Sequence, residues 1–131
     1  MTYIAPFAVL KRRYKVSATA DVDRVAISYR DLQELVRSVL RGVNVDEAWY
    51  LRQYPDVEEA VRSGIFKSAK HHFVQNGYFE GRRPSHCSVD EDWYLLTYPD
   101  VAHAIDAEQL MNAAEHFYSS GYEEGRLPSE Y

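Results

Sequence analysis

One block of this sequence occurs twice, and the duplication constrains the fold more than any other feature. Residues 45–87 and 89–131 align without a gap, and 21 of the 43 aligned positions are identical. The Trp-Tyr-Leu and Tyr-Pro-Asp-Val segments of residues 49–57 return 44 residues later, at 93–101. A unit of this length cannot bury its apolar face alone, so the two copies are expected to stack on each other.

Each copy is predicted to form three short helices. The first begins at Asp46 or Asp90 and ends at Tyr-Pro-Asp, because a residue that precedes proline disfavours the α conformation. The proline then suits the first position of a second helix. The third helix carries the His-Phe pair and is predicted to end at Gly77 or Gly121, as the C′ glycine of a Schellman motif.

An amphipathic helix is predicted before the repeats. Ser28 is a good N-cap, and Asp31 follows three residues later, as in a capping box. Apolar residues then recur at helical spacing, and Gly42 marks the end of the helix. This stripe consists of Leu32, Leu35, Val36, Val39 and Leu40. It must pack on the repeats or on a copy of itself, so it is a candidate surface for a partner or for self-association.

The first 27 residues are predicted to form a short arm that contains β-structure. Residues 3–10 have the β-branched and aromatic bias of a strand. Residues 17–23 suggest a turn, and residues 24–27 a second strand, which together would make a hairpin. The expected fold is therefore mainly α. It comprises the arm (1–27), the amphipathic helix and linker (28–44), and two stacked helical repeats (45–88 and 89–131).

Charge is divided unevenly along the chain. Residues 1–44 carry eight Lys or Arg against four Asp or Glu, whereas residues 45–131 carry seven against 16. The asymmetry indicates a basic contact surface or docking between the two parts, with solvated faces of opposite sign as the alternative. Four cations around Tyr14, at residues 11–15, could contact nucleic acid or an anionic membrane. Without a nucleic-acid-binding fold, however, nucleic acid is not expected as a partner.

The sequence predicts a cytoplasmic protein without a transmembrane segment. No apolar run approaches the roughly 18 to 20 residues needed to cross a bilayer. The basic cluster follows the apolar start instead of preceding it, which is the wrong order for a signal peptide. The single cysteine, Cys87, excludes an intrachain disulfide framework.

The repeated motif resembles a known family of short helical repeats. The pattern in residues 45–131 is Tyr-Leu…Tyr-Pro-Asp-Val…Ala…His-Phe…Gly-Tyr…Glu-Gly-Arg…Pro. It looks like the tandem units of bacterial proteins that accompany glycosyltransferase and polysaccharide-biosynthesis domains and that occur in large surface or haemolysin-type proteins. The resemblance implies an accessory module in envelope or polysaccharide biology, and it implies no settled activity.

The residues shared by both copies are the candidate site residues. A His, two acids and an Arg could form a general acid/base site or bind an anion. An equal set in each repeat is nevertheless typical of a structural network, so we predict no catalytic residue. The shared residues are Trp49, Tyr54, Asp56, His72, Glu80 and Arg82 in the first copy, and Trp93, Tyr98, Asp100, His116, Glu124 and Arg126 in the second.

Neither a metal ion nor another cofactor is expected, because the histidines and the cysteine do not follow a zinc motif. Trp49, Trp93 and their neighbouring tyrosines could form a stacking platform for sugars, or they could form the core. The expected function is a non-catalytic protein-interaction or scaffolding module that binds a protein partner or forms homo-oligomers. A carbohydrate-binding module is the first alternative, and an enzyme that uses the repeated His and acid pairs is the second.

Overall fold

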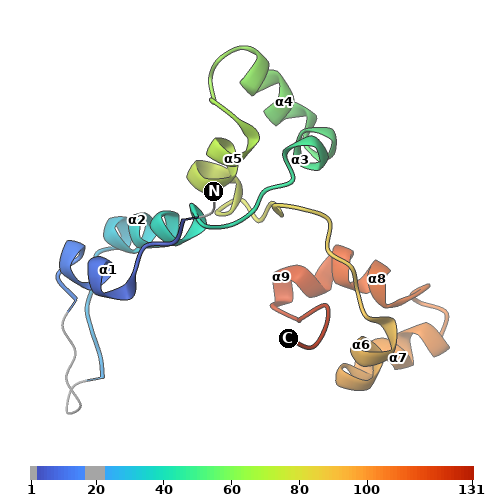
Figure 1. Cartoon of the computed structure of the whole chain (residues 1–131). Coiled ribbons are helices and arrows are strands. Elements are labelled where there is room, and N and C mark those ends of the chain that lie inside the picture. Colours follow the sequence, from blue (N-terminus) through green and yellow to red (C-terminus); the bar gives the residue numbers. More distant parts are fainter. Residues whose placement is uncertain (1–2, 17–22) are drawn as a thin grey trace. The chain divides into compact units, whose positions relative to one another are not determined.

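The structure, a computed structural model, describes residues 3–16 and 23–131 and is mainly helical (Figure 1). No β-strand occurs among the described residues. The chain divides into two compact units, Met1–Ser85 and His86–Tyr131, and each is described by itself. The predicted mainly α fold is thus confirmed.

The prediction of a strand near the N-terminus is wrong, because this segment forms helix α1 (Phe7–Arg13). The carbonyl of Pro6 accepts the N–H groups of Val9 and Leu10 at 3.0 and 3.2 Å, which starts the helix. A proline that precedes a helix costs no helical hydrogen bond, and α1 buries the side chain of Leu10.

The prediction of a second strand is also wrong. Residues 23–28 have no regular secondary structure and contain exposed side chains, including Val25. The rest of the proposed hairpin, residues 17–22, lies outside the described residues.

The amphipathic helix is α2 (Tyr29–Leu40), and its predicted N-cap is confirmed. The hydroxyl of Ser28 accepts the N–H of Asp31 at 3.1 Å. The apolar stripe divides between two environments. Leu40 is buried, and it belongs to the core of the first unit, against which Val36 also packs. Leu35 is half-buried, whereas the side chains of Leu32 and Val39 are exposed.

The rest of the first unit is formed by short helices in the predicted order. The carboxylate of Asp46 caps the first of them by accepting the N–H of Trp49 at 3.0 Å, as predicted. Tyr54 breaks the helix before Pro55, which is the first residue of the next one. The elements are α3 (Glu47–Gln53), α4 (Pro55–Arg62), α5 (Ala69–His72) and the π-helical turn η1 (Phe73–Gly77). Tyr50, Val57, Ala69 and Phe73 are buried at their centre.

The second unit has the same order of elements and a core of its own. These elements are α6 (Glu91–Thr97), α7 (Pro99–Asp106), α8 (Ala113–His116), the π-helical turn η2 (Phe117–Gly121) and α9 (Tyr122–Glu124). Tyr94, Val101, Ala113 and Phe117 are buried there, at the positions that match the core of the first unit. Each unit therefore buries its own aromatic rings, and the stacking of the two repeats stays a prediction.

The predicted end of the third helix is wrong by four residues. Gly77 does not adopt the left-handed conformation, because it lies within η1 and Tyr78 continues the right-handed path. The left-handed residue is Gly81, with φ 80°. The N–H of Arg82 bonds to the carbonyl of Gly77 at 2.9 Å, and that of Gly81 to the carbonyl of Tyr78 at 3.1 Å. This is the Schellman pattern with Gly81 at C′.

The second unit repeats this correction. Gly125, with φ 81°, takes the place of Gly121 as the left-handed residue. The N–H of Arg126 bonds to the carbonyl of Gly121 at 2.9 Å. In both units the Schellman motif therefore fixes where the following arginine leaves the helix.

Candidate functional site

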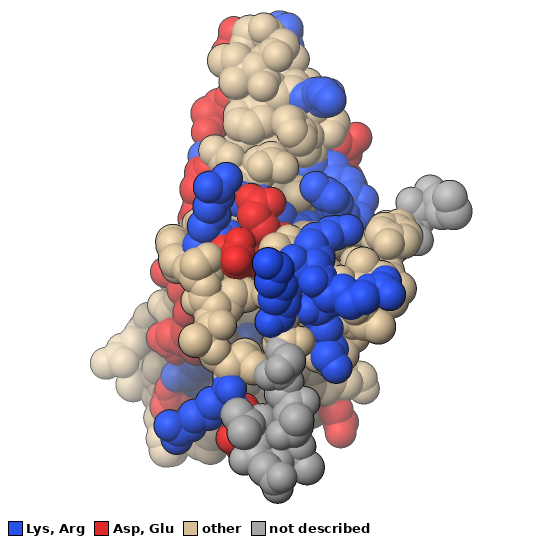
Figure 2. All heavy atoms as spheres, turned by 90° about the vertical axis from the view of Figure 1, so that its left-hand side faces the viewer, with Lys and Arg blue, Asp and Glu red and all other residues tan. Residues whose placement is uncertain are grey.

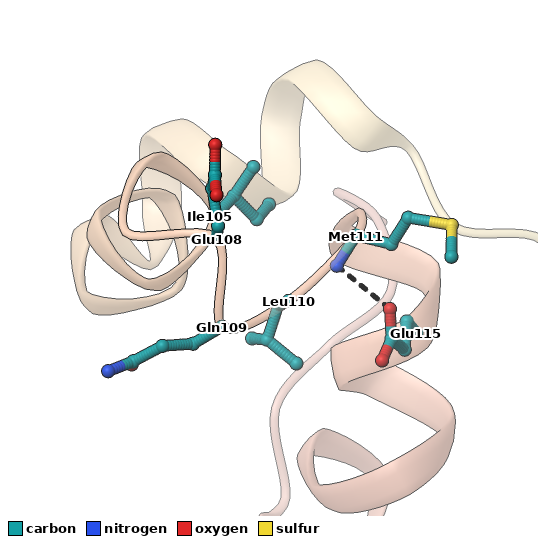
Figure 3. Close-up of a pocket in the computed structure, with 6 residues that line it drawn as sticks. All are labelled: Ile105, Glu108, Gln109, Leu110, Met111 and Glu115. Carbon is teal, nitrogen blue, oxygen red and sulfur yellow. Dashed lines mark hydrogen bonds between the residues drawn. The ribbon is translucent and has the colours of Figure 1, made fainter.

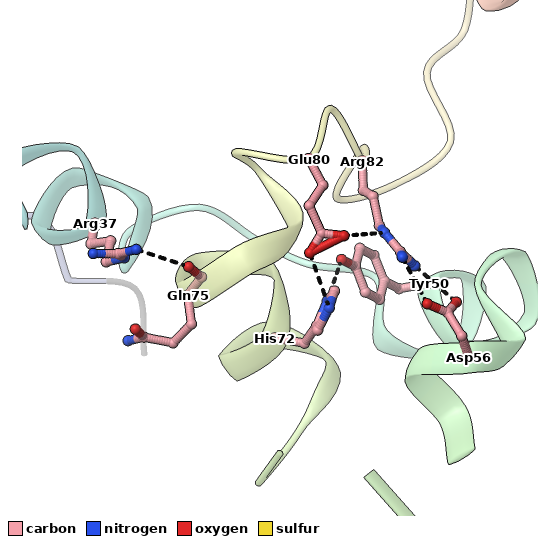
Figure 4. Close-up of polar contacts among 7 residues, drawn as sticks. All are labelled: Arg37, Tyr50, Asp56, His72, Gln75, Glu80 and Arg82. Atoms are coloured by element: carbon pink, nitrogen blue, oxygen red, sulfur yellow. Dashed lines mark hydrogen bonds and ion pairs between the residues drawn. The ribbon is translucent and has the colours of Figure 1, made fainter. Parts of the chain in front are cut away.

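A buried Tyr–His pair lies at the centre of the candidate site in the first unit (Figure 4). The Tyr50 hydroxyl lies 2.9 Å from Nδ1 of His72, and these side chains are 0% and 5% exposed. A Cβ atom on Gly77 would collide with the Tyr50 hydroxyl oxygen. The glycine is therefore required by the close approach of this hydroxyl to η1, and not by a turn.

Glu80 connects the histidine to an arginine (Figure 4). Nε2 of His72 lies 3.8 Å from one carboxylate oxygen of Glu80, and the other oxygen accepts the Nε–H of Arg82 at 3.2 Å. Both ring nitrogens of His72 are thus directed at protein groups.

Arg82 also binds Asp56 through two parallel hydrogen bonds of 2.9 and 2.7 Å. This bidentate geometry is the strong form of an Arg–carboxylate pair. The guanidinium lies over the Tyr54 ring, 4.9 Å from its centroid, and the Tyr54 hydroxyl accepts the N–H of Arg83 at 3.1 Å. Arg82 therefore connects the start of α4 to the segment that leaves the repeat.

We call these five residues, Tyr50, His72, Glu80, Arg82 and Asp56, the polar network. The second unit has the corresponding network of Tyr94, His116, Glu124, Arg126 and Asp100. Its Tyr–His distance is 2.8 Å, its two Arg–Asp hydrogen bonds measure 2.8 and 2.7 Å, and its Arg–Glu distance is 2.7 Å. The arginine again lies 4.9 Å from the ring centroid of Tyr98. The Tyr–His, Arg–Asp and Arg–Glu contacts are thus reproduced where the surrounding sequence differs.

Burial and charge set the protonation states in the network. Burial lowers the pKa of His72, and the negative charge of Glu80 opposes this effect only in part. The hydrogen bonds from Arg82 hold the pKa of Asp56 below its usual range, and those from Arg126 lower the pKa of Asp100 to about 2. At neutral pH the His72 ring is therefore neutral, and both aspartates are ionised.

The two tryptophans pack at the edge of each core. Each is half-buried and meets a tyrosine ring, Tyr54 or Tyr98, edge-on at 6.2 Å between centroids. The Arg83 guanidinium lies 5.8 Å from the centroid of the Trp49 ring. The indoles therefore combine a packing role with partial exposure.

Sequence analysis did not assign Tyr50, Tyr94 or the two glycines of the π-helical turns to the site. All four are identical between the copies, which was the available signal. The aromatic rings were attributed to the core, and the glycines were attributed to helix ends. A hydroxyl that approaches a helix this closely requires a glycine opposite it, and the spacing along the chain does not reveal such a contact.

The second unit also contains an open hollow that the repeat motif does not line (Figure 3). It lies between α7 and α8, with a volume of about 470 Å³. Its lining residues are Ile105, Glu108, Gln109, Leu110, Met111 and Glu115. Glu115 accepts the N–H of Met111 at 2.8 Å, so one of the two carboxylates already stabilises the loop. The hollow belongs to the positions where the two copies differ.

Across residues 3–16 and 23–131, no group of three His, Cys, Asp or Glu side chains is placed to hold a metal ion. None of the helices in the described part of the chain has the length and apolar character needed to cross a membrane.

Comparisons of the chain with protein families, curated proteins and solved structures find no match. The function is therefore inferred from geometry and sequence.

Proposed function

We propose that this chain is a non-catalytic interaction or scaffolding module built from two helical repeats. The observation that supports it most directly is that the shared polar residues contact one another within each unit. The pair of Tyr50 and His72 in the first unit is matched by the pair of Tyr94 and His116 in the second. A catalytic acid or base must exchange a proton with a substrate, whereas in each unit the tyrosine hydroxyl and the histidine Nδ1 are hydrogen-bonded to each other.

Recognition is then assigned to the positions that differ between the copies. Residues that maintain the shape of a repeat must be kept in each copy, whereas exposed residues are free to adapt to a partner. Leu96 and Met111 are examples, because they are exposed and stand where the first copy has Arg52 and Lys67. The proposed partner is a protein, either a different one or a second copy of this chain.

The resemblance of the repeated motif supports a role in envelope or polysaccharide biology as part of this proposal. Carbohydrate binding is the second candidate, because Trp49 and Trp93 keep partial exposure. A glycan array would test carbohydrate binding. We expect the wild-type chain to show no glycan signal that disappears in the Trp49→Ala and Trp93→Ala variants. A cytoplasmic location stays a prediction.

The main experiment separates the network from the surface. Tyr50→Phe and Tyr94→Phe remove a hydroxyl from each network, whereas Leu96→Arg introduces on the second copy the residue that the first copy has. Proteins cross-linked to the whole chain in host cells are quantified by mass spectrometry, at a temperature where circular dichroism shows every variant folded. We expect the phenylalanine variants to keep their partners and the surface variant to lose some. Loss of partners by a folded phenylalanine variant would contradict the proposal.

A further inference from the structure

The net charge differs among three consecutive segments of the chain, and it falls from positive through zero to negative. Residues 1–44 carry eight Lys or Arg against four Asp or Glu, residues 45–85 carry six against six, and residues 86–131 carry one against ten. The two repeats therefore differ by nine charges although they share the polar network. Since the network needs only one arginine in each unit, its chemistry does not explain this difference.

The positive charge of the N-terminal region is concentrated on one surface, which we call the basic face. It consists of Lys11, Arg12, Arg13 and Lys15, all exposed, at the end of α1 and just beyond it. Figure 2 shows the α1 and α2 side of the molecule, where Lys and Arg side chains gather. Within the described part of the chain, none of the four forms an ion pair.

The basic face includes a hollow and lies next to exposed apolar side chains. Lys11, Arg12 and Lys15 line an open hollow of about 550 Å³. Phe7 is 72% exposed, and Nζ of Lys11 lies 5.6 Å from the centroid of its ring. Ile4 is 62% exposed. A surface that exposes both cations and large apolar groups suits a partner that offers carboxylates and apolar side chains together.

The second unit has both kinds of group among its exposed residues. Its one cation, Arg126, is already bound to Asp100 and Glu124. Five carboxylates of this fully described unit have no hydrogen-bond or ion-pair partner within it, and they belong to Asp92, Asp106, Glu108, Glu123 and Glu130. The negative charge of the unit is thus left available to an external cation.

Comparison with the first copy shows how this surface differs. Every cation of the first repeat other than the network arginine is replaced in the second by an apolar or acidic residue. The replacements are Leu96 for Arg52, Asp106 for Arg62, Met111 for Lys67, Ala114 for Lys70 and Leu127 for Arg83. Leu96 and Met111 are 84% and 81% exposed. Since the first repeat folds with cations at these positions, folding does not require their loss.

We propose that the basic face of one molecule binds the acidic second unit of another molecule of the same chain. The chain contains both complementary surfaces, so each molecule has one basic face and one acidic unit to bind it. Because the two surfaces differ, the contact is heterologous and copies can add head to tail. This inference rests on the proposed interaction role and names the partner.

The test measures self-association of the whole chain by sedimentation velocity over a range of protein concentrations. The basic-face variant carries Lys11→Glu, Arg12→Glu and Lys15→Glu. The acidic-unit variant carries Leu96→Arg, Asp106→Arg and Met111→Lys, which are the residues of the first copy at these positions. We expect each variant to associate at least about tenfold more weakly than the wild-type chain. A control with Arg52→Glu and Lys67→Glu changes exposed cations of the first repeat and should associate like the wild type.

Mixing the two variants provides the decisive measurement. Each has one intact surface, so together they should form a discrete one-to-one dimer that grows no further. High salt should dissociate this dimer, because about 1 M salt shortens the screening length to about 3 Å. Circular dichroism of each variant establishes that it is folded.

Three results would overturn the inference. They are a wild-type chain that stays monomeric at all concentrations, association that survives in both variants, and tighter binding of the basic face to phosphatidylglycerol vesicles than to a second copy. A monomeric chain that still captures a different protein in the cross-linking experiment would overturn this inference but not the proposed interaction role.

Discussion

The two units contain the same polar network in different surroundings. In the first unit the ring of Phe66 lies 4.8 Å from that of His72, and the guanidinium of Arg37 in α2 donates to the carbonyl of Gln75 in η1 at 3.1 Å (Figure 4). In the second unit Leu110 stands at the position of Phe66, and His116 is only half-buried. The Tyr–His and Arg–Asp geometry is nevertheless the same.

This difference teaches that the network belongs to the repeat itself. Neither the extra helix nor the aromatic ring beside the histidine is needed to form it. The neighbouring residues change the burial of the histidine, because His72 is 5% exposed whereas His116 is only half-buried. Equivalent substitutions in the two units should therefore share a direction and differ in size wherever burial matters.

The largest effect is expected from Gly77→Ala and Gly121→Ala. In each unit the new Cβ would collide with the hydroxyl of Tyr50 or Tyr94, so the hydroxyl must move away from its histidine. We expect each change to lower the free energy of unfolding of its own unit by about 3 kcal/mol. Urea unfolding followed by hydrogen exchange and mass spectrometry would report the units separately. The exposed neighbour substitution Asn76→Ala is the control, and an equal loss there would refute the assignment.

The next effect is expected from removing the hydroxyls themselves. Tyr50→Phe should lower the free energy of unfolding by about 2 kcal/mol, and Tyr94→Phe by about 1 kcal/mol, because water can reach the less buried histidine. The same hydrogen-exchange measurement applies. In addition, Tyr50→Phe should partly rescue Gly77→Ala, because it removes the atom that the new methyl group meets. Strict additivity of the two changes would show that this contact is not the cause.

A smaller effect is expected at the turn after the second helix of each repeat. Gly64 adopts φ 82° in the first unit, whereas its counterpart Glu108 adopts φ 58° in the second. Left-handed backbone costs a residue with a Cβ atom about 1 kcal/mol. Glu108→Gly should thus stabilise the second unit, and Gly64→Ala should destabilise the first, each by about 1 kcal/mol. Glu108→Ala keeps a Cβ atom, so it should not reproduce the gain in thermal unfolding.

The smallest effect is expected from pH. Burial lowers the pKa of His72, so the unfolded chain binds a proton at this residue before the native state does. The contribution of neutral His72 to the free energy of unfolding is complete above the unfolded pKa of about 6.5, and it is lost as pH falls below that value. Between about pH 7 and pH 5, the first unit should lose more stability than a His72→Gln variant loses. Equal pH profiles by urea titration would exclude this role.

A separate loss belongs to more acidic solution. Arg82 and Arg126 lower the pKa values of Asp56 and Asp100, so these pairs stabilise the native state above the usual aspartate pKa and lose this contribution as pH falls. The loss begins below about pH 4, well separated from the histidine effect.

Local signals in the sequence predicted much of the repeat. Asp46 and Ser28 cap helices as expected, and Tyr54 and Pro55 separate two helices, because capping and proline geometry depend on a few neighbouring atoms. The strand predicted for residues 3–10 failed because a short apolar run does not by itself distinguish a strand from a helix. The segment forms α1, which buries Leu10 and leaves Phe7 exposed.

The sequence predicted which residues form the candidate site better than it predicted how they are arranged. Duplication identified His72, Glu80, Arg82 and Asp56 as one set, and they do lie together. The π-helical turn had no signal in the periodicity, and so Gly77 was assigned to a helix end. The position of the Tyr50 hydroxyl explains why residue 77 is a glycine. This position depends on packing between helices that are distant in sequence.

The π-helical turns have a consequence for how these repeats can change in length. A π turn corresponds to an α-helix that has gained one residue, and each residue of an α-helix turns the chain by about 100°. A deletion within residues 73–77 would restore regular helix and rotate Gly77 away from the Tyr50 hydroxyl. This segment should therefore accept substitutions more readily than insertions or deletions.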